Sequence, residues 1–178
     1  GYFLTSDVDT ILRVAALSGK NEEKLMAFNL SAPFLSEFFT KQMEQVLPYV
    51  DILFGNREEA SAFAKSKKIE DSAEAVCNYF CNLKRPDEMI HKQRIAIITN
   101  GKSAIVYQSG QTKGTYTVSP MDHQSIVDTN GAGDGFVAGF LYQFQQNKSL
   151  DDSIEMGIKC AKYVLRQSGF SLGDRDQF

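Results

Sequence analysis

Cysteine and histidine are scarce in this 178-residue chain, which contains three cysteines and two histidines. A sparse, odd set of cysteines is typical of reduced thiols in a cytosolic protein rather than of a disulfide framework. Cys77 and Cys81 share a face of a predicted helix, but a metal site would need further ligands. We therefore interpret these thiols, with Cys160, as ordinary buried or surface side chains of a cytoplasmic protein.

A basic excess and a long apolar run are also lacking. The formal net charge is −3 and the pI is near 5.4, whereas a nucleic-acid-binding surface is strongly basic. No apolar run approaches the ~20 residues that cross a bilayer. The opening segment Gly1–Thr5 lacks the basic flank and apolar core of a signal peptide. We expect a globular protein that binds neither nucleic acid nor membranes.

Short apolar runs alternate with longer amphipathic segments, which is typical of a βα-repeating fold. The apolar runs predict strands at residues 1–4, 25–30, 50–54, 95–99, 104–108 and 115–118. Helical periodicity predicts helices after an N-cap at Ser6, over residues 57–64 and 73–83, and along apolar stripes at 136–144 and 154–165. The pattern predicts one three-layer α/β/α domain over residues 1–178, around a mostly parallel central sheet.

Residues 126–140 hold the strongest chemical signal. An apolar run ends there, the small residues Gly131, Ala132 and Gly133 follow, and an amphipathic helix begins. Small residues at a helix start leave the backbone N–H groups uncovered, so these groups and the helix dipole can bind an anion. Gly135 and Gly139 would also let this helix approach a neighbour closely.

Asp134 lies within this cluster of small residues, where a carboxylate would repel a bound phosphate. Its position makes sense if it accepts a proton from an attacking hydroxyl while the amides stabilise the transferred phosphoryl group. The competing interpretation is that Asp134 only complements the helix dipole. Taken alone, the sequence leaves both open.

Two other glycine patterns do not match known phosphate-binding loops. Gly131-x-Gly133 would need a third glycine at position 136, which is Phe136, to form a dinucleotide fingerprint. Gly101-Lys-Ser would need a glycine at position 96, which is Ala96, to form a Walker A loop. We therefore exclude both classes.

Asn56 and Glu59 follow the predicted strand 50–54 with the spacing of a capping box. The functional interpretation is that Asn56 faces phosphates and Glu59 helps to hold a hydrated magnesium ion, which needs few protein ligands. The two interpretations are compatible, because an N-cap already lies at the anion-facing end of its helix.

Together these motifs resemble the ribokinase-like, or pfkB, carbohydrate kinases. The segment 128–134 resembles their anion-hole signature, and Asn56-x-x-Glu59 resembles their Asn-x-x-Glu motif. Segments 2–5, 29–34 and 51–56 are similar to the adenosine kinase branch, and the resemblance covers essentially the whole chain. It implies transfer of the ATP γ-phosphoryl group to the 5′-hydroxyl of adenosine in purine salvage, in the cytoplasm and alternatively the nucleus.

The resemblance also assigns roles to individual residues. Asp134 is the implied base, and the amides of residues 131–133 are the implied anion hole. The implied ATP and phosphate ligands are Asn56, Thr99, Gly101 and Asn130. Glu59 is the implied water-mediated magnesium ligand, Asp128 lies near an implied monovalent-cation site for K⁺, and Phe34 and Tyr2 are implied nucleoside contacts. For both aromatic residues, core packing is the alternative.

The family's amino-terminal half and lid have no counterpart here, and the chain opens inside a predicted strand without an initiator methionine. We therefore expect a piece of a longer protein, monomeric when complete and inactive on its own. Two alternatives remain open at this stage, namely a sugar kinase of the same superfamily and a non-catalytic nucleotide-binding fragment.

Overall fold

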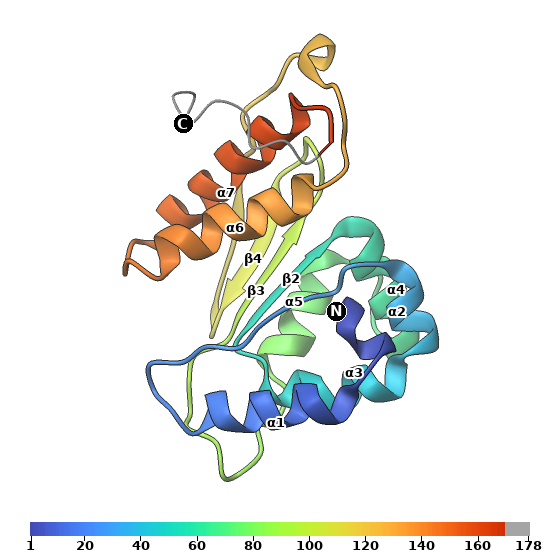
Figure 1. The fold of residues 1–178 in the computed structure, drawn as a ribbon, viewed down its shortest axis with the longest axis vertical. Helices are drawn as coiled ribbons and strands as arrows, with labels where there is room; N and C mark the ends of the chain where they lie inside the picture. Colours follow the sequence, from blue (N-terminus) through green and yellow to red (C-terminus); the bar gives the residue numbers. More distant parts are fainter. Residues whose placement is uncertain (170–178) are drawn as a thin grey trace. The chain divides into compact units, whose positions relative to one another are not determined.

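The computed structural model describes residues 1–169 (Figure 1). The chain divides into two compact units, Gly1–Thr115 and Tyr116–Phe178. One five-stranded sheet runs in the order β1-β2-β3-β4-β5, and its strands are β1 Ala27–Asn29, β2 Ile52–Asn56, β3 Ile95–Thr99, β4 Ile105–Ser109 and β5 Thr112–Tyr116.

The first three strands are parallel, and β4 runs antiparallel to β3. Gly110, with a φ of 57°, lies in the short connection that leads from β4 to β5. The expected α/β class with a parallel core is confirmed. The sheet is mixed because the chain returns directly after β3 instead of crossing over through a helix.

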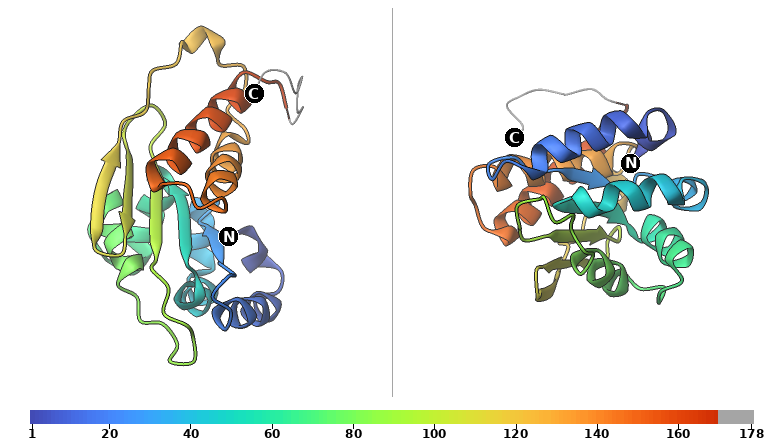
Figure 2. Two further views of the ribbon diagram at one scale, coloured as in Figure 1. Left: turned by 90° about the vertical axis from the view of Figure 1, so that its left-hand side faces the viewer. Right: turned by 90° about the horizontal axis from the view of Figure 1, so that it is seen from below.

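In the first unit, two helices precede β1 and the other helices connect the parallel strands. They are the 3₁₀ helices η1 (Tyr2–Thr5) and η2 (Leu47–Tyr49) and the α-helices α1 (Val8–Gly19), α2 (Pro33–Phe38), α3 (Thr40–Val46), α4 (Arg57–Lys67) and α5 (Ala73–Cys81). Helices α4 and α5 pack against the sheet strands (Figure 2). Their apolar faces, with Phe63, Val76 and Phe80, join the buried side of β2 and β3 in one core.

The predicted strand at residues 1–4 is wrong, because these residues form η1. The hydroxyls of Thr5 and Ser6 donate to the carbonyls of Tyr2 and Phe3, which stabilises a tight turn. The N-cap of the following helix is also one residue later than predicted, since Asp7 and not Ser6 accepts from the Thr10 amide at 3.1 Å.

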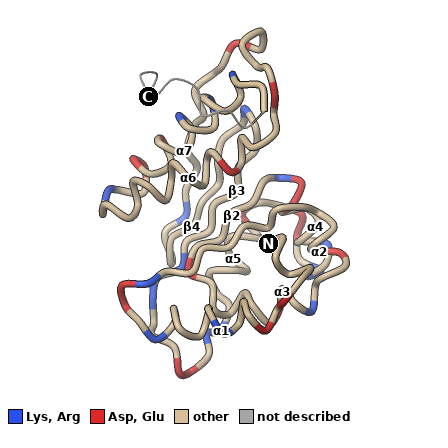
Figure 3. Tube along the Cα trace, in the orientation of Figure 1, with Lys and Arg blue, Asp and Glu red and all other residues tan. Residues whose placement is uncertain are grey.

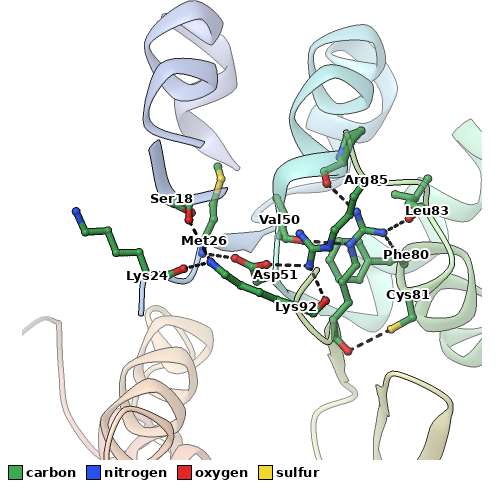
Figure 4. Close-up of polar contacts among 12 residues, drawn as sticks. Ser18, Lys24, Met26, Val50, Asp51, Phe80, Cys81, Leu83, Arg85 and Lys92 are labelled. Carbon is green, nitrogen blue, oxygen red and sulfur yellow. Dashed lines mark hydrogen bonds and ion pairs between the residues drawn. The ribbon is translucent and has the colours of Figure 1, made fainter. Parts of the chain in front are cut away.

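A buried ionic network lies at the amino ends of β2 and β3 (Figure 4). The Arg94 guanidinium donates to four backbone carbonyls, those of Pro48, Val50, Phe80 and Leu83. Arg85 and Asp51 form a buried ion pair at 2.8 Å, and Asp51 also accepts from the Met26 amide at 2.9 Å. This network ties the strand starts to α5 and to the segment that follows it.

The ammonium group of Lys92 forms further hydrogen bonds at the same end of this unit. Its Nζ donates to the carbonyl of Ser18 in the last turn of α1, at 3.1 Å, and to those of Asn21, at 2.6 Å, and Lys24 in the connection between α1 and β1. Hydrogen bonds from a charged donor are strong, so the loop at residues 84–94 is anchored at this end of the sheet.

The second unit contains η3 (His123–Ser125) and two long helices, α6 (Ala132–Phe144) and α7 (Leu150–Leu165), which pack side by side. A Cβ at Gly139 would lie 2.6 Å from the Met156 carbonyl oxygen, and one at Gly157 would lie 2.8 Å from the Phe136 ring. A Cβ at Gly135 would lie 2.9 Å from Val164 Cγ2, so the predicted close approach at Gly135 and Gly139 is confirmed.

Acidic and basic residues are interspersed along the trace (Figure 3). Among residues 1–169, no helix is both long enough and apolar enough to span a membrane. Within the same range, no three side chains of histidine, cysteine, aspartate or glutamate gather as a metal site would require.

Candidate functional site

The carboxyl ends of the three parallel strands carry the first group of candidate residues. Asn29 ends β1, Asn56 ends β2 and Thr99 ends β3, and the register pairs Asn56 directly with Thr99. Ligands of open α/β sheets bind outside the carboxyl ends of parallel strands. Three polar side chains at this edge therefore form a candidate binding surface in the first unit.

Asn56 and Glu59 form a complete capping box at the start of α4. The Asn56 side chain accepts from the Glu59 amide at 2.9 Å, and the Glu59 carboxylate accepts from the Asn56 amide at 3.0 Å. The second carboxylate oxygen accepts from Asn56 Nδ2 at 2.9 Å. The capping interpretation is thus confirmed, and it holds both side chains at the carboxyl edge of the sheet.

Burial raises the pKa of Glu59, and the hydrogen bond from the Asn56 backbone opposes that rise. The residue is only 7% exposed. Within residues 1–169, Glu59 belongs to no group of three or more histidine, cysteine, aspartate or glutamate side chains that could hold a metal ion, so coordination by several such side chains does not fit. The donor set fits a hydrated magnesium ion held through water, because Mg²⁺ keeps several of its waters.

The turn after β3 is open. Gly101 has a φ of 55°, which favours glycine, and nothing lies within 4 Å of the position where its Cβ would be. Thr99 Oγ1 donates to the Gly55 carbonyl at 3.4 Å. A ligand can therefore approach the backbone of residues 99–101 without meeting a side chain at position 101.

The second unit carries the segment with Asp134. Asp128 Oδ1 accepts from the Asn130 amide at 2.9 Å, and Gly131, with a φ of 78°, is the N-cap of α6. Helix α6 has no side-chain cap, as is also true of the short helices α2 and α3, whereas α1, α4, α5 and α7 each have one. The first amides of α6 are therefore left to another acceptor.

Most of these first amides have no hydrogen-bond acceptor among the described residues. Within residues 1–169, the N–H groups of Gly131, Gly133 and Asp134 donate to no protein acceptor, and that of Ala132 makes only a 3.4 Å bond to Thr129. Nothing lies within 4 Å of a Cβ built on Gly133. Packing therefore does not require glycine at position 133, whereas close approach of a ligand to the backbone would.

The Asp134 side chain is exposed in the first turn of α6. It has no hydrogen-bonding partner and no ion-pair partner among the described residues. Its position is compatible with both earlier interpretations, since a first-turn carboxylate complements the helix dipole and an exposed carboxylate is free to accept a proton.

The two aromatic residues that were predicted to contact the nucleoside are in contact with each other. The Tyr2 and Phe34 rings meet edge to face, with centroids 6.2 Å apart and an interplanar angle of 87°. Tyr2 is 65% exposed and Phe34 is 36% exposed, so neither ring belongs to the buried core. Phe39 contacts the Phe34 ring as well, at 6.4 Å.

Sequence reasoning missed Ser31, which has a φ of 68° although it is not glycine. Its amide donates to Asn29 Oδ1 at 3.2 Å, and its hydroxyl donates to the Asn29 carbonyl at 3.1 Å. The available signal was Asn29-x-Ser31 directly after a predicted strand, because asparagine side chains often hydrogen-bond the backbone two residues later.

A mixed sheet with a polar carboxyl edge, and a glycine-started helix with free amides, are features typical of phosphate-binding α/β proteins. The model of the pfkB family of carbohydrate kinases matches residues 1–176, so the chain belongs to this family.

Several curated proteins that are similar to this chain over nearly its whole length are named adenosine kinases. Adenosine kinase 2 of Arabidopsis thaliana is 34% identical over 179 residues, covering 100% of this chain and 51% of the relative. The adenosine kinase of Schizophyllum commune is 35% identical over 172 residues, covering 95% and 50%. The chain thus spans about half the length of the curated relatives it matches.

Solved structures agree with these matches. Adenosine kinase from Schistosoma mansoni in complex with 2-fluoroadenosine superposes with a TM-score of 0.93 at 36% identity, covering 99% of this chain and 52% of that one. The Anopheles gambiae adenosine kinase in complex with P1,P4-di(adenosine-5) tetraphosphate has a TM-score of 0.87 at 34% identity, covering 94% and 49%.

Proposed function

We propose that this chain provides the nucleotide-binding and catalytic part of an ATP-dependent adenosine kinase, which forms AMP from adenosine. The substrate assignment is supported by the relatives, which are named adenosine kinases, and by a solved adenosine kinase in complex with adenosine and AMP. The chain's own residues support the transfer step. In a cell, this reaction would serve purine salvage.

The observation that carries the proposal is the uncapped start of α6. Free amides at Gly131 and Gly133, with open space beside Gly133, suit the negative oxygens of a phosphoryl group in transfer. Asp134 would accept the proton of the attacking 5′-hydroxyl as its oxygen bonds to the γ-phosphorus of ATP and the bond from that phosphorus to the leaving ADP breaks. Positioning and charge stabilisation are most of what this chemistry requires.

The other residues would handle the nucleotide and its ions. Asn56, Thr99, Gly101 and Asn130 would contact ATP and its phosphates. Glu59 would hold Mg²⁺ through water, and the metal would neutralise phosphate charge when bound. Asp128, whose Oδ1 closes a local turn, would lie near a K⁺ site. Phe34 and Tyr2 would contact the nucleoside base.

The proposal is tested by giving the protein adenosine or ribose together with Mg-ATP and measuring AMP and ribose phosphate. The 178-residue chain and a version extended with the amino-terminal half of a related adenosine kinase are assayed in parallel. We expect AMP, little ribose phosphate, and activity in the extended version only. Ribose as the better acceptor would indicate a sugar kinase, and ATP binding without either product would indicate a non-catalytic role.

A further inference from the structure

Ser31 lies at the centre of a strained turn. The Ala32 amide donates to the Leu30 carbonyl at 2.8 Å, so three residues close a γ-turn around Ser31. Ser31 has a φ of 68°, and γ-turns with positive φ are rare and costly, above all at a residue with a Cβ. Such strain persists only where the surroundings enforce it, and it gathers at functional sites.

Asn29 enforces the turn. Its Oδ1 accepts from the Ser31 amide at 3.2 Å, and its carbonyl accepts from the Ser31 hydroxyl at 3.1 Å. Asn29 is itself fixed as the last residue of β1, in register with Phe54 of β2. Asn29 therefore fixes the position of Ser31 relative to the edge of the sheet through two hydrogen bonds.

The turn sets the direction in which α2 leaves the sheet. Pro33 opens α2 directly after the turn, and Phe34 is the next residue. The Phe34 ring lies between the rings of Tyr2 and Phe39, at 6.2 Å and 6.4 Å, with edge-to-face geometry on both sides. Edge-to-face geometry is a favoured arrangement of aromatic pairs, so these contacts stabilise the orientation of the Phe34 ring. Tyr2 and Phe34 thus form a preformed aromatic corner that remains partly exposed.

We propose that Asn29 and Ser31 are positioning residues for nucleoside recognition, because the Ser31 turn places the Tyr2–Phe34 corner to receive a planar purine base. This inference rests on the proposed function, since it gives the corner a nucleoside ligand. A corner fixed before binding does not need to be ordered by the ligand, which favours affinity.

The test compares two substitutions at one position. Ser31→Gly keeps access to positive φ, whereas Ser31→Val opposes it through its branched Cβ. Asn29→Ala removes the acceptor that holds the turn. We expect NMR contacts between the Tyr2 and Phe34 rings to persist in Ser31→Gly and to be lost in Ser31→Val and Asn29→Ala, with all three variants folded by circular dichroism.

Ligand binding supplies the second readout, in the extended protein. Ser31→Val should weaken adenosine binding about tenfold or more and leave ATP binding within about twofold, while Ser31→Gly should bind both nearly as the unmodified protein does. Equal loss of adenosine and ATP affinity, or ring contacts unchanged in every variant, would overturn the proposal. If Ser31→Val does not fold, Asn29→Ala decides the question by the same two readouts.

If the unmodified protein binds no adenosine, the proposed function fails, and the proposed role of Asn29 and Ser31 in nucleoside recognition fails with it. Adenosine binding with unchanged ring contacts would instead overturn the positioning role alone.

Discussion

Asn56 and Glu59 hold each other through three hydrogen bonds of 2.9–3.0 Å across the first turn of α4. The same pair therefore serves as a helix cap and holds the Glu59 carboxylate at the carboxyl edge of the sheet. The same hydrogen bonds form the helix cap and would position Glu59 as the proposed magnesium ligand. These two roles can therefore be separated only by substitutions that keep the cap and change the charge.

Glu59→Gln is such a substitution. Glutamine can still accept from the Asn56 amide, so we expect the free energy of unfolding to change by less than about 1 kcal/mol. The lost charge should raise the Mg²⁺ concentration needed for half-maximal turnover several-fold in the extended protein. Thermal unfolding and a magnesium titration measure the two effects. An unchanged magnesium response would leave Glu59 with the capping role alone.

Gly133→Ala should impair function without a structural cost. Its new methyl group meets no atom within 4 Å, and alanine favours helix over glycine by up to about 1 kcal/mol. We expect equal or slightly higher stability and, in the extended protein, turnover reduced at least tenfold, because the methyl group would occupy the space through which the phosphate reaches the backbone. Denaturant unfolding and steady-state kinetics test this. Full turnover in a stable Gly133→Ala variant would remove the anion-hole assignment.

Gly139→Ala is the structural counterpart on the same helix. Its Cβ would lie 2.6 Å from the Met156 carbonyl oxygen and 2.7 Å from Cys160 Sγ, so α6 and α7 would have to separate. Overpacking of this kind costs about 1–3 kcal/mol. The midpoint of urea unfolding should fall accordingly. No change in the midpoint would mean that the two helices are packed less tightly than described.

The thiols provide a pH-dependent prediction. Burial raises the pKa of Cys77 to about 12 and that of Cys81 to about 11. Since the folded chain keeps these protons more tightly than the unfolded chain, stability should be lost as pH rises from about 9 toward these values. At pH 8, iodoacetamide should leave Cys77 unmodified until urea is added, as mass spectrometry would show. Prompt labelling of Cys77 in the folded protein would contradict its burial.

Local patterns allowed much of the fold to be predicted. Strand β3 occupies the predicted residues 95–99, and the capping box at Asn56 begins α4 as its spacing indicated. Both depend on contacts within a few residues. The predicted strand at residues 1–4 failed because hydroxyl groups of Thr5 and Ser6, rather than apolar content, decide the local conformation.

Long-range polar contacts could not be predicted. Arg94 bonds to carbonyls as distant in sequence as that of Pro48, and Arg85 pairs with Asp51, 34 residues away. Nothing local in the sequence identifies such partners. The strained turn at Ser31 could not be predicted for a similar reason. A positive φ at a serine is imposed by its surroundings and is not favoured by the residue itself.

Asp134→Asn in the extended protein tests the central claim most directly. Asparagine keeps the shape of the side chain but cannot accept the proton of the 5′-hydroxyl as a carboxylate does, so AMP formation should fall by roughly two to four orders of magnitude. ATP and adenosine binding should be nearly unchanged, since a base acts in the transition state. Turnover within a few-fold of the unmodified protein would contradict the assignment and leave Asp134 as a carboxylate that only complements the helix dipole.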